Sequence, residues 1–498
     1  MTTPVEPGHA APAATGPTTR TTPASSTWSA AVAAGYDHDR PSLWQGDRWW
    51  SGRELLARAA GAADWLDGLG LAPGAWVPAL VAGSPEAIAL TVGGAGSNHP
   101  LAPLGVRMTA QELAAVVAPV ASPVLLTQPE HEPLARAVAA RRGCRVVVIP
   151  SLPASGRALA AAPDDVAVVL HTSGTTGLPK AVPMPQWRLA ARARVYAGVC
   201  GLGPESCCAA VAPFHHVAGL GNVAVALAAG ARITGLPRFS VGGWGLLREL
   251  GVTHTNVVPA MLEMLLAAGQ AHLPGLRSLV YGGAPIRPGT LRRVCVALPG
   301  VRLYNFFGQT EGSPITVLGP GDHADALRDQ PDLLLSVGRA VPGVELAVRS
   351  VAADGVGEVW ARADHFFRRD GAGWLDTGDL GRTDADGRLY LAGRRNDMII
   401  RGGENVHPLE VEIAVGEHPR VADVAVAGAA DERLGETVVA FVVASDPADP
   451  PSAAELHAFT RARLSGFKVP VRWHLVAELP RSPNGKVLRR SLREPGAR

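Results

Sequence analysis

The chain has 498 residues, of which 47% are hydrophobic and 18% are charged, and its formal net charge is +2. This length predicts more than one domain. The nearly balanced charge gives no strong field, so neither nucleic acid nor an acidic membrane surface is indicated as a partner. The five cysteines show no metal-ligand spacing, and their odd number fits no disulfide framework. We therefore expect reduced thiols in a cytoplasmic protein.

The first 30 residues are rich in Thr, Pro, Ala and Ser and lack the apolar core of a signal peptide. We predict that residues 1–30 form a disordered tail. The longest stretch without charge, residues 207–230, contains two histidines and several glycines. This composition favours a buried strand–loop–helix passage over a membrane span.

From about residue 51, helical and strand-like patterns alternate. Residues 53–60 have helical composition, and Ser84-Pro85-Glu86 is typical of a helix start. Strands alternating with helices predict an α/β protein with layered, mostly parallel sheets. The predicted strands in this part of the chain are residues 76–81, 145–150, 166–170, 231–234 and 278–281.

The pattern changes twice further along the chain. Short alternating strands at 344–351 and 357–362 indicate a smaller β-rich subdomain. After residue 393, a compact α+β unit is predicted, with helices at 410–415 and 453–464 and strands at 421–428 and 437–444. We therefore place the boundary at 393–397, between an N-terminal domain of residues 31–392 and a C-terminal domain of residues 393–498.

A polar loop follows the apolar run Val166–Leu170. It is written His171-Thr172-Ser173-Gly174-Thr175-Thr176-Gly177-Leu178-Pro179-Lys180. Glycines allow backbone N–H groups to approach phosphate oxygens, hydroxyls add donors, and the lysine supplies positive charge. The loop therefore suits a polyphosphate, although a flexible polar turn is the alternative for such a loop taken alone.

Several further motifs follow this loop, and together they resemble the adenylate-forming superfamily of acyl- and aryl-CoA ligases, peptide-synthetase adenylation domains and beetle luciferase. The resemblance covers nearly the whole chain beyond the tail and is closest in style to the acyl- and aryl-CoA ligases. It implies a large N-terminal domain with a small, mobile C-terminal lid. The motifs are Pro213–Gly219, Tyr281–Pro285, Asn305–Glu311, Gly338–Gly343, Gly357–Val359, Thr377–Leu380, Gly393–Asp397, Gly402–Pro408 and Asn484–Lys486.

The resemblance implies that ATP activates a carboxylic acid, with Mg²⁺ as cofactor. Thr310 would contact the α-phosphate, and Glu311 would bind the Mg²⁺ that shields the same charge. The alternative for Thr310-Glu311 is a helix N-terminal capping pair. The residues expected to hold the β- and γ-phosphates are Thr172, Ser173, Gly174, Thr175, Thr176, Gly177 and Lys180.

The same resemblance implies a nucleoside site. Asp379 would accept hydrogen bonds from both ribose hydroxyls, because a carboxylate offers two oxygens to two neighbouring donors. An Asx turn at a strand end is the alternative for Asp379. Arg394 would support the ribose or the α-phosphate. Gly283 and Ala284 would leave room for adenine, and Phe307 would pack against the base.

In the lid, Lys486 is expected to bridge the substrate carboxylate and the α-phosphate. An ordinary surface lysine is the alternative. The hinge between domains is expected at Asn396, where relatives usually have Asp or Lys, and asparagine tolerates unusual backbone angles. Gly402 and Gly403 would line a tunnel for the pantetheine arm of CoA.

His216 stands where CoA ligases carry a histidine that borders the acyl pocket. We expect His215 to point into the structure instead, since neighbouring strand or loop residues face opposite ways. A buried core histidine is the alternative for both. The rest of the acid pocket would come from residues 258–260, Gly282 and residues 306–308, which are small and apolar. A hydrophobic or aromatic acid is therefore favoured over an amino acid.

The leading hypothesis is an acyl- or aryl-CoA ligase that forms an acyl-adenylate and transfers the acyl group to CoA. Val471 departs from this pattern, because many CoA ligases have a basic residue directly after the preceding proline. Lys468 remains in this segment, although a solvated charge at a helix end is the alternative for it. The near alternative keeps adenylation but uses a carrier-protein thiol, an amine or another small nucleophile as acceptor. A catalytically dead nucleotide-binding protein is the distant alternative. No feature of the sequence predicts an oligomeric state.

Overall fold

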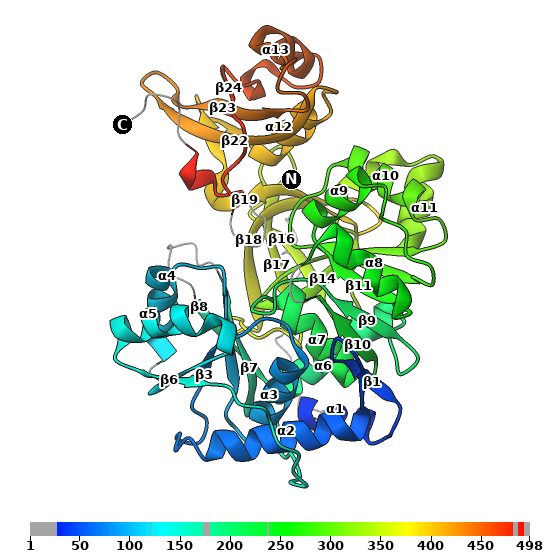
Figure 1. Cartoon of the computed structure of the whole chain (residues 1–498). Helices are drawn as coiled ribbons and strands as arrows, with labels where there is room; N and C mark the ends of the chain where they lie inside the picture. The colour runs from blue at the N-terminus through cyan, green and yellow to red at the C-terminus, as the bar shows by residue number, and fades with distance from the viewer. Residues whose placement is uncertain (1–26, 121, 173–179, 237–238, 482–486, 493–498) are drawn as a thin grey trace, which may run out of the picture.

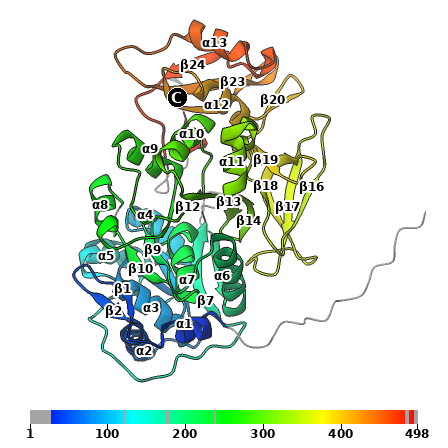
Figure 2. The same cartoon turned by 90° about the vertical axis from the view of Figure 1, so that its right-hand side faces the viewer.

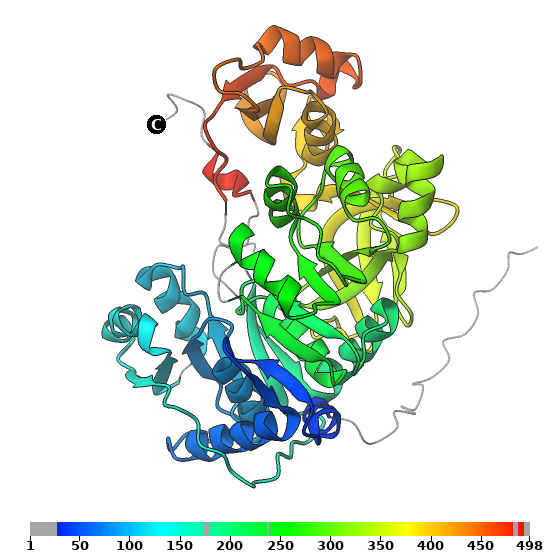
Figure 3. The same cartoon turned by 45° about the vertical axis from the view of Figure 1, so that its right-hand side comes forward.

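The computed structural model describes residues 27–120, 122–172, 180–236, 239–481 and 487–492. It contains two α/β layers side by side, a small antiparallel sheet and a C-terminal α+β unit above them (Figures 1 and 3). The predicted fold class is confirmed. Ser173–Gly177 and Lys486 lie outside the described residues.

The first sheet contains the three strands predicted at 76–81, 145–150 and 166–170 and three further strands that were not predicted, β4, β5 and β8. All its neighbouring strands are parallel except β7 and β8, which form an antiparallel pair. Ser84 caps the N-terminus of helix α3 (Pro85–Gly96) by accepting from the Ala87 N–H, as the sequence predicts. Helices α2 (Gly52–Asp67), α4 (Ala110–Val117) and α5 (Glu132–Arg142) complete this layer. The strand order is β6 (Arg145–Val148), β5 (Val124–Thr127), β3 (Val77–Leu80), β4 (Leu101–Leu104), β7 (Val166–Thr172) and β8 (Lys180–Pro185).

The second sheet has nine strands, and its centre is parallel. Helices α1 (Trp28–Tyr36), α6 (Gln186–Cys200) and α7 (Asn222–Ala228) pack against one another beside it (Figure 2). Helices α8 (Val241–Glu249), α9 (Pro259–Ala267), α10 (Pro288–Ala297) and α11 (Pro320–Arg328) complete the layer. The strand order is β15 (Arg339–Ala340), β14 (Gly312–Leu318), β13 (Arg302–Gln309), β12 (Ser278–Gly282), β11 (His254–Val257), β9 (Cys207–Ala210), β10 (Arg232–Gly235), β1 (Pro41–Trp44) and β2 (Trp49–Ser51).

The end of the predicted N-terminal tail, residues 28–30, belongs to a helix. Helix α1 begins at Trp28, which is fully buried, and Thr27 caps it by accepting from the Ala30 N–H. The sequence did not indicate that a helix begins here, because the run of Thr, Pro, Ala and Ser continues up to the capping residue Thr27. The uncharged passage 207–230 is the predicted strand, loop and helix. None of the helices in the described ranges has the length and apolar character needed to span a membrane.

The β-rich subdomain is a four-stranded antiparallel sheet of β16 (Glu345–Arg349), β17 (Gly357–Arg362), β18 (Trp374–Thr383) and β19 (Leu389–Arg394). The C-terminal unit contains β20 (Ile399–Arg401), β21 (Glu404–Val406), α12 (Pro408–Gly416), β22 (Val421–Asp431), β23 (Gly435–Ala444), α13 (Ala453–Arg461) and β24 (Arg472–Leu475). It has a core of its own, formed by residues such as Val411, Val426 and Val438. We call this unit the lid.

Candidate active site

The predicted ribose carboxylate is held by the predicted arginine. Asp379 lies opposite Arg394 on the neighbouring strands β18 and β19, and Arg394 Nε is 3.0 Å from Asp379 Oδ1. Arg394 Nη1 also donates to the backbone oxygen of Thr377 at 2.8 Å. Asp379 is only 8% exposed, whereas the Arg394 side chain is 43% exposed. Because Asp379 lies within a strand, the alternative of an Asx turn at a strand end is wrong.

The Thr310-Glu311 turn lies close to this pair. Gln309, the residue before the turn, donates its side-chain N–H to the same Thr377 oxygen at 3.3 Å. The backbone oxygen of Glu311 accepts from the N–H groups of Phe367 and Arg368 at 2.8 and 3.1 Å. The turn connects the antiparallel strands β13 and β14, so the alternative of a helix cap is wrong.

The half-buried Glu311 fits a magnesium ligand. Among the described residues, no cluster of three or more His, Cys, Asp or Glu side chains could hold a metal ion by itself. Mg²⁺ is usually bound through one or two carboxylates together with substrate phosphates. A single carboxylate beside a nucleotide site is therefore an appropriate donor set.

Thr172 and Lys180 frame the predicted phosphate loop. They face each other at the ends of β7 and β8, and the Thr172 hydroxyl donates to the Lys180 backbone oxygen at 3.5 Å. The Lys180 side chain is exposed. The loop itself, with Ser173, Gly174, Thr175, Thr176 and Gly177, lies outside the described residues, so its phosphate contacts stay a prediction.

The two adjacent histidines differ from the expectation that they face opposite ways. Their ring centroids are 3.8 Å apart, because His215 and His216 lie in a turn and not in a strand. Burial above all, together with the neighbouring His216, Arg107 and His171, lowers the pKa of His215 to about 3. A Cβ on Gly105 would lie 2.8 Å from His215 Nε2, so this loop packs tightly against the ring. His215 is therefore neutral and packed, as expected for a core histidine.

A π-helical turn over Val217–Gly221 continues from His216 into α7. Such turns are rare and are frequently found at functional sites. A Cβ on Gly219 would lie 2.0 Å from the backbone oxygen of Pro213, so this chain path requires glycine at position 219. Gly219 therefore allows the tight turn that follows His216 and packs against Pro213.

Arg192 on α6 was not predicted and is only 2% exposed. Its guanidinium donates to the backbone oxygen of Gly221 at 2.6 Å, to Asn222 Oδ1 at 3.1 Å and to Ser313 Oγ at 3.4 Å. No carboxylate forms an ion pair with it within the described ranges. Burial lowers the pKa of Arg192 to about 10, so it remains charged at neutral pH. Arg192 thus joins the π-helical turn after His216 to the start of β14, directly after Glu311.

We expect Arg192→Met to lower the free energy of unfolding by about 2–3 kcal/mol, since one buried and two partly buried acceptors lose a charged donor. The loss of a desolvated charge offsets part of that cost. Urea unfolding at pH 7.5 measures the change. Arg194→Met, which replaces an exposed arginine on the same helix, is the control and should change stability by less than about 0.5 kcal/mol. Equal effects of both variants would contradict this role.

The predicted adenine site lies where β12 and β13 end side by side. A Cβ on Gly282 would lie 2.5 Å from the backbone oxygen of Phe306, and Gly283 has a φ of +80°. Ala284 follows and is half-buried. Phe306 packs on Tyr196 with ring centroids 4.7 Å apart, whereas Phe307 packs toward the core of the subdomain. The side chains of Phe306 and Phe307 therefore project from opposite faces of β13.

In the lid, Gly402 and Gly403 form the exposed turn between β20 and β21, with φ values of +60° and +87°. Asn396 is exposed in a short 3₁₀ turn between β19 and β20. Arg287 of the N-terminal domain donates to the backbone oxygen of Val421 at 3.4 Å. Lys486 lies outside the described residues, so its position stays a prediction.

Comparison with protein families decides the identity of this arrangement. Residues 30–369 match the model of the AMP-binding enzyme family, and residues 410–486 match its C-terminal domain. The chain belongs to the AMP-binding enzyme family. This AMP-binding enzyme is therefore a member of the adenylate-forming superfamily, as the motifs indicate, and the use of ATP is supported.

Similar members act on different acceptors. The AMP-binding enzyme is 33% identical over 478 residues to a fatty acid–[acyl-carrier-protein] ligase of Streptomyces coeruleorubidus, covering 86% of this chain and 88% of that one. It is 33% identical to a 2-succinylbenzoate–CoA ligase of Bacillus cereus, covering 66% and 70%. The amide bond synthetase McbA from Marinactinospora thermotolerans has a TM-score of 0.83 and 29% identity, covering 93% and 98%. Adenylating activity is thus supported.

Proposed function

We propose that this enzyme activates a hydrophobic or aromatic carboxylic acid with ATP and transfers the acyl group to CoA. The observation that carries the proposal is the buried Asp379 carboxylate beside Arg394, next to the Thr310-Glu311 turn. Buried carboxylates are rarely retained without a partner or a task. The Asp379 carboxylate is paired with Arg394, which is partly exposed. A carboxylate beside a cation suits a ligand that offers both hydroxyls and a phosphate.

In the first half-reaction, an oxygen of the acid attacks the α-phosphorus of ATP, and the bond to pyrophosphate breaks. Two anions must approach, so positive charge and fixed donors are required. Thr310 would contact the α-phosphate, and Lys180 with the Thr172 loop would hold the leaving phosphates. Lys486 would stabilise the charge that builds up between the acid and the phosphorus. Mg²⁺ on Glu311 would neutralise phosphate charge.

In the second half-reaction, the thiolate of CoA attacks the carbonyl carbon, and AMP leaves. The lid would rotate about Asn396 to present another face. Gly402 and Gly403 suit the passage of a pantetheine arm, because their turn is exposed and a Cβ on Gly403 would meet no atom within 4 Å.

A second candidate acceptor is favoured by a specific feature of the lid. Both carboxylate oxygens of Glu410 lie 2.7–2.8 Å from the ammonium of Lys468, so this cation is already engaged. The side chain of Val471, where a basic residue is common in CoA ligases, is 48% exposed. Position 471 therefore offers no cation to the nucleotide part of CoA, and the next residue, Arg472, stands one place further along the chain. A carrier-protein thiol or an amine is therefore the alternative.

The acceptor is tested by mass spectrometry of the products. Purified enzyme with ATP, Mg²⁺ and an activated acid is given CoA, phosphopantetheinylated carrier protein or a primary amine in separate reactions. We expect the acyl-CoA thioester to form fastest. Val471→Arg should then lower the KM for CoA several-fold without changing acyl-adenylate formation. A faster reaction with the carrier protein or the amine would overturn the CoA assignment and leave adenylation standing.

A further inference from the structure

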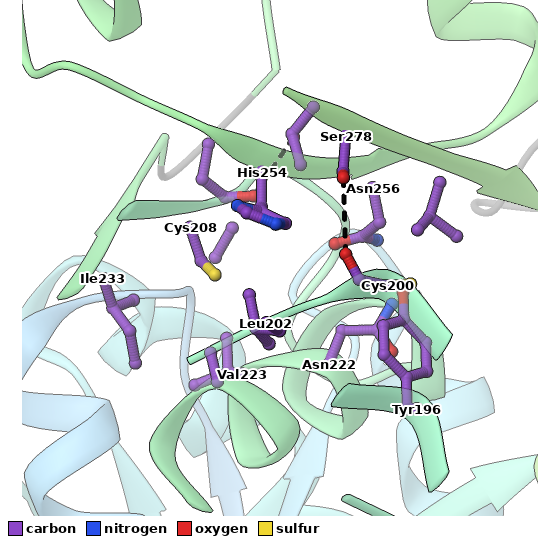
Figure 4. Close-up of a pocket in the computed structure, with 15 residues that line it drawn as sticks. Tyr196, Cys200, Leu202, Cys208, Asn222, Val223, Ile233, His254, Asn256 and Ser278 are labelled. Atoms are coloured by element: carbon purple, nitrogen blue, oxygen red, sulfur yellow. Dashed lines mark hydrogen bonds between the residues drawn. The ribbon is translucent and has the colours of Figure 1, made fainter. Parts of the chain in front are cut away.

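Arg192 carries a buried positive charge that forms no ion pair with a carboxylate among the described residues. Its guanidinium donates to three neutral oxygens, those of Gly221, Asn222 and Ser313, at 2.6, 3.1 and 3.4 Å. The ring of Tyr196, whose centroid is 5.7 Å from Arg192 Cζ, is also neutral, because burial raises the pKa of its hydroxyl well above the ordinary value. Figure 4 shows Tyr196 and Asn222, which belong to the neighbouring helices α6 and α7. Neutral dipoles, and not an anion, therefore surround this charge in the part of the chain that the structure describes.

The guanidinium contacts two turns of the proposed site. The oxygen of Gly221 belongs to the π-helical turn that follows His216. Ser313 lies at the start of β14, directly after the Thr310-Glu311 turn. A Cβ on Gly308, at the end of β13, would lie 2.7 Å from the Cβ of Ser313, so the two strands that flank this turn are in close contact. The guanidinium therefore lies between the turn expected to border the acid and the turn expected to bind the α-phosphate and Mg²⁺.

A buried charge without an anionic partner has a free-energy cost, because no ion pair offsets its desolvation. Burial lowers the pKa of Arg192 to about 10, so the guanidinium stays charged at neutral pH. An anion that binds nearby recovers part of this cost, since charges attract one another more strongly inside a protein than in water. Acid activation requires two anions, a carboxylate and a triphosphate, to approach each other.

We propose that Arg192 is a positioning residue for acid activation, whose unpaired positive charge attracts the substrate carboxylate toward the Thr310-Glu311 turn. This inference rests on the proposed function. Arg192 acts without touching the acid, through the field of its charge and through the two turns that it joins. A purely structural bridge between the turns would, in contrast, make no distinction between a carboxylate and a neutral group of similar shape.

The experiment compares an acid with its neutral amide. Benzoate, cinnamate and octanoate are assayed by acid-dependent pyrophosphate release, and the primary amide of the best substrate is measured as a competitive inhibitor. Arg192→Gln removes the charge but keeps side-chain N–H donors. We expect this variant to raise the KM for the acid by about tenfold or more, while the Ki of the amide stays within about twofold of the wild type. Arg192→Lys, which keeps the charge, should hold the KM for the acid within about threefold.

The matched control is Arg194→Met, which replaces an exposed arginine of the same helix and should leave both constants unchanged. All variants are measured at a temperature at which circular dichroism shows them to be folded. The inference is wrong if Arg192→Gln keeps a normal KM for the acid, if it weakens acid and amide equally, or if Arg192→Lys is impaired as strongly as Arg192→Gln. If the wild type releases pyrophosphate with no acid, the proposed function itself fails.

Discussion

Asp379→Ala is expected to raise the KM for ATP by about a hundredfold or more. The ribose hydroxyls would lose the carboxylate that accepts their hydrogen bonds, and Arg394 would lose its anionic partner beside the nucleotide. A hydrogen bond to a charged group contributes about 1.5–3 kcal/mol, and about 2.7 kcal/mol corresponds to a hundredfold. Acid-dependent pyrophosphate release at varied ATP concentrations measures the change. Asp379→Asn, which keeps one acceptor oxygen, should lie between the variant and the wild type.

The matched control is Asp386→Ala in the same subdomain. Asp386 pairs with Arg388, and its side chain is 66% exposed. The KM for ATP should stay within twofold of the wild type in that variant. If Asp379→Ala keeps a normal KM for ATP and remains folded by circular dichroism, the assignment of the ribose site is wrong.

Lys486→Ala is expected to lower kcat for acyl-adenylate formation by about 10²–10³-fold, with little change in the KM for ATP. Removing one fixed donor that acts on transition-state charge typically has this effect. A contact made chiefly in the transition state changes kcat and leaves ground-state binding largely intact. Single-turnover formation of the acyl-adenylate, followed by quenching and mass spectrometry, measures the chemical step directly.

Thioester formation from a supplied acyl-adenylate gives a second readout for Lys486→Ala. This half-reaction should be nearly normal, because no new bond to phosphorus forms in it. Arg463→Ala is the control, since Arg463 is a cation of the same lid that pairs with Glu417 at 3.6 Å. The rate of acyl-adenylate formation should be unchanged in Arg463→Ala. A normal adenylation rate in Lys486→Ala would remove this residue from the mechanism.

Much of the fold could be predicted because local sequence patterns determine where many helices begin and which segments form strands. The Ser84-Pro85 helix start and the alternating strand at Gly357–Arg362 are set by neighbouring residues, and both are confirmed. Helix α1 was not predicted, since Trp28 belongs to the core through contacts with distant α7. Its indole donates to the backbone oxygen of Ala224, 196 residues away, which no local pattern reveals.

The motifs predicted that certain residues lie near one another, whereas residues positioned only by packing were not predicted. Asp379 and Arg394 were expected in one nucleoside site, and their pairing across β18 and β19 agrees with it. Arg192 was missed because an arginine on a helix is usually solvent-exposed. The expectation for His215 and His216 failed because alternation applies to strands, and these residues form a turn.

The most direct test asks for the acyl-adenylate itself. The enzyme is incubated with Mg²⁺, ATP and a panel of aromatic, cinnamic and medium-chain acids, without any acceptor, and the products are identified by mass spectrometry. The account predicts pyrophosphate together with a mixed anhydride of AMP and at least one acid. Folded enzyme that yields no such anhydride with any acid, or that releases ADP instead of AMP products, would contradict it.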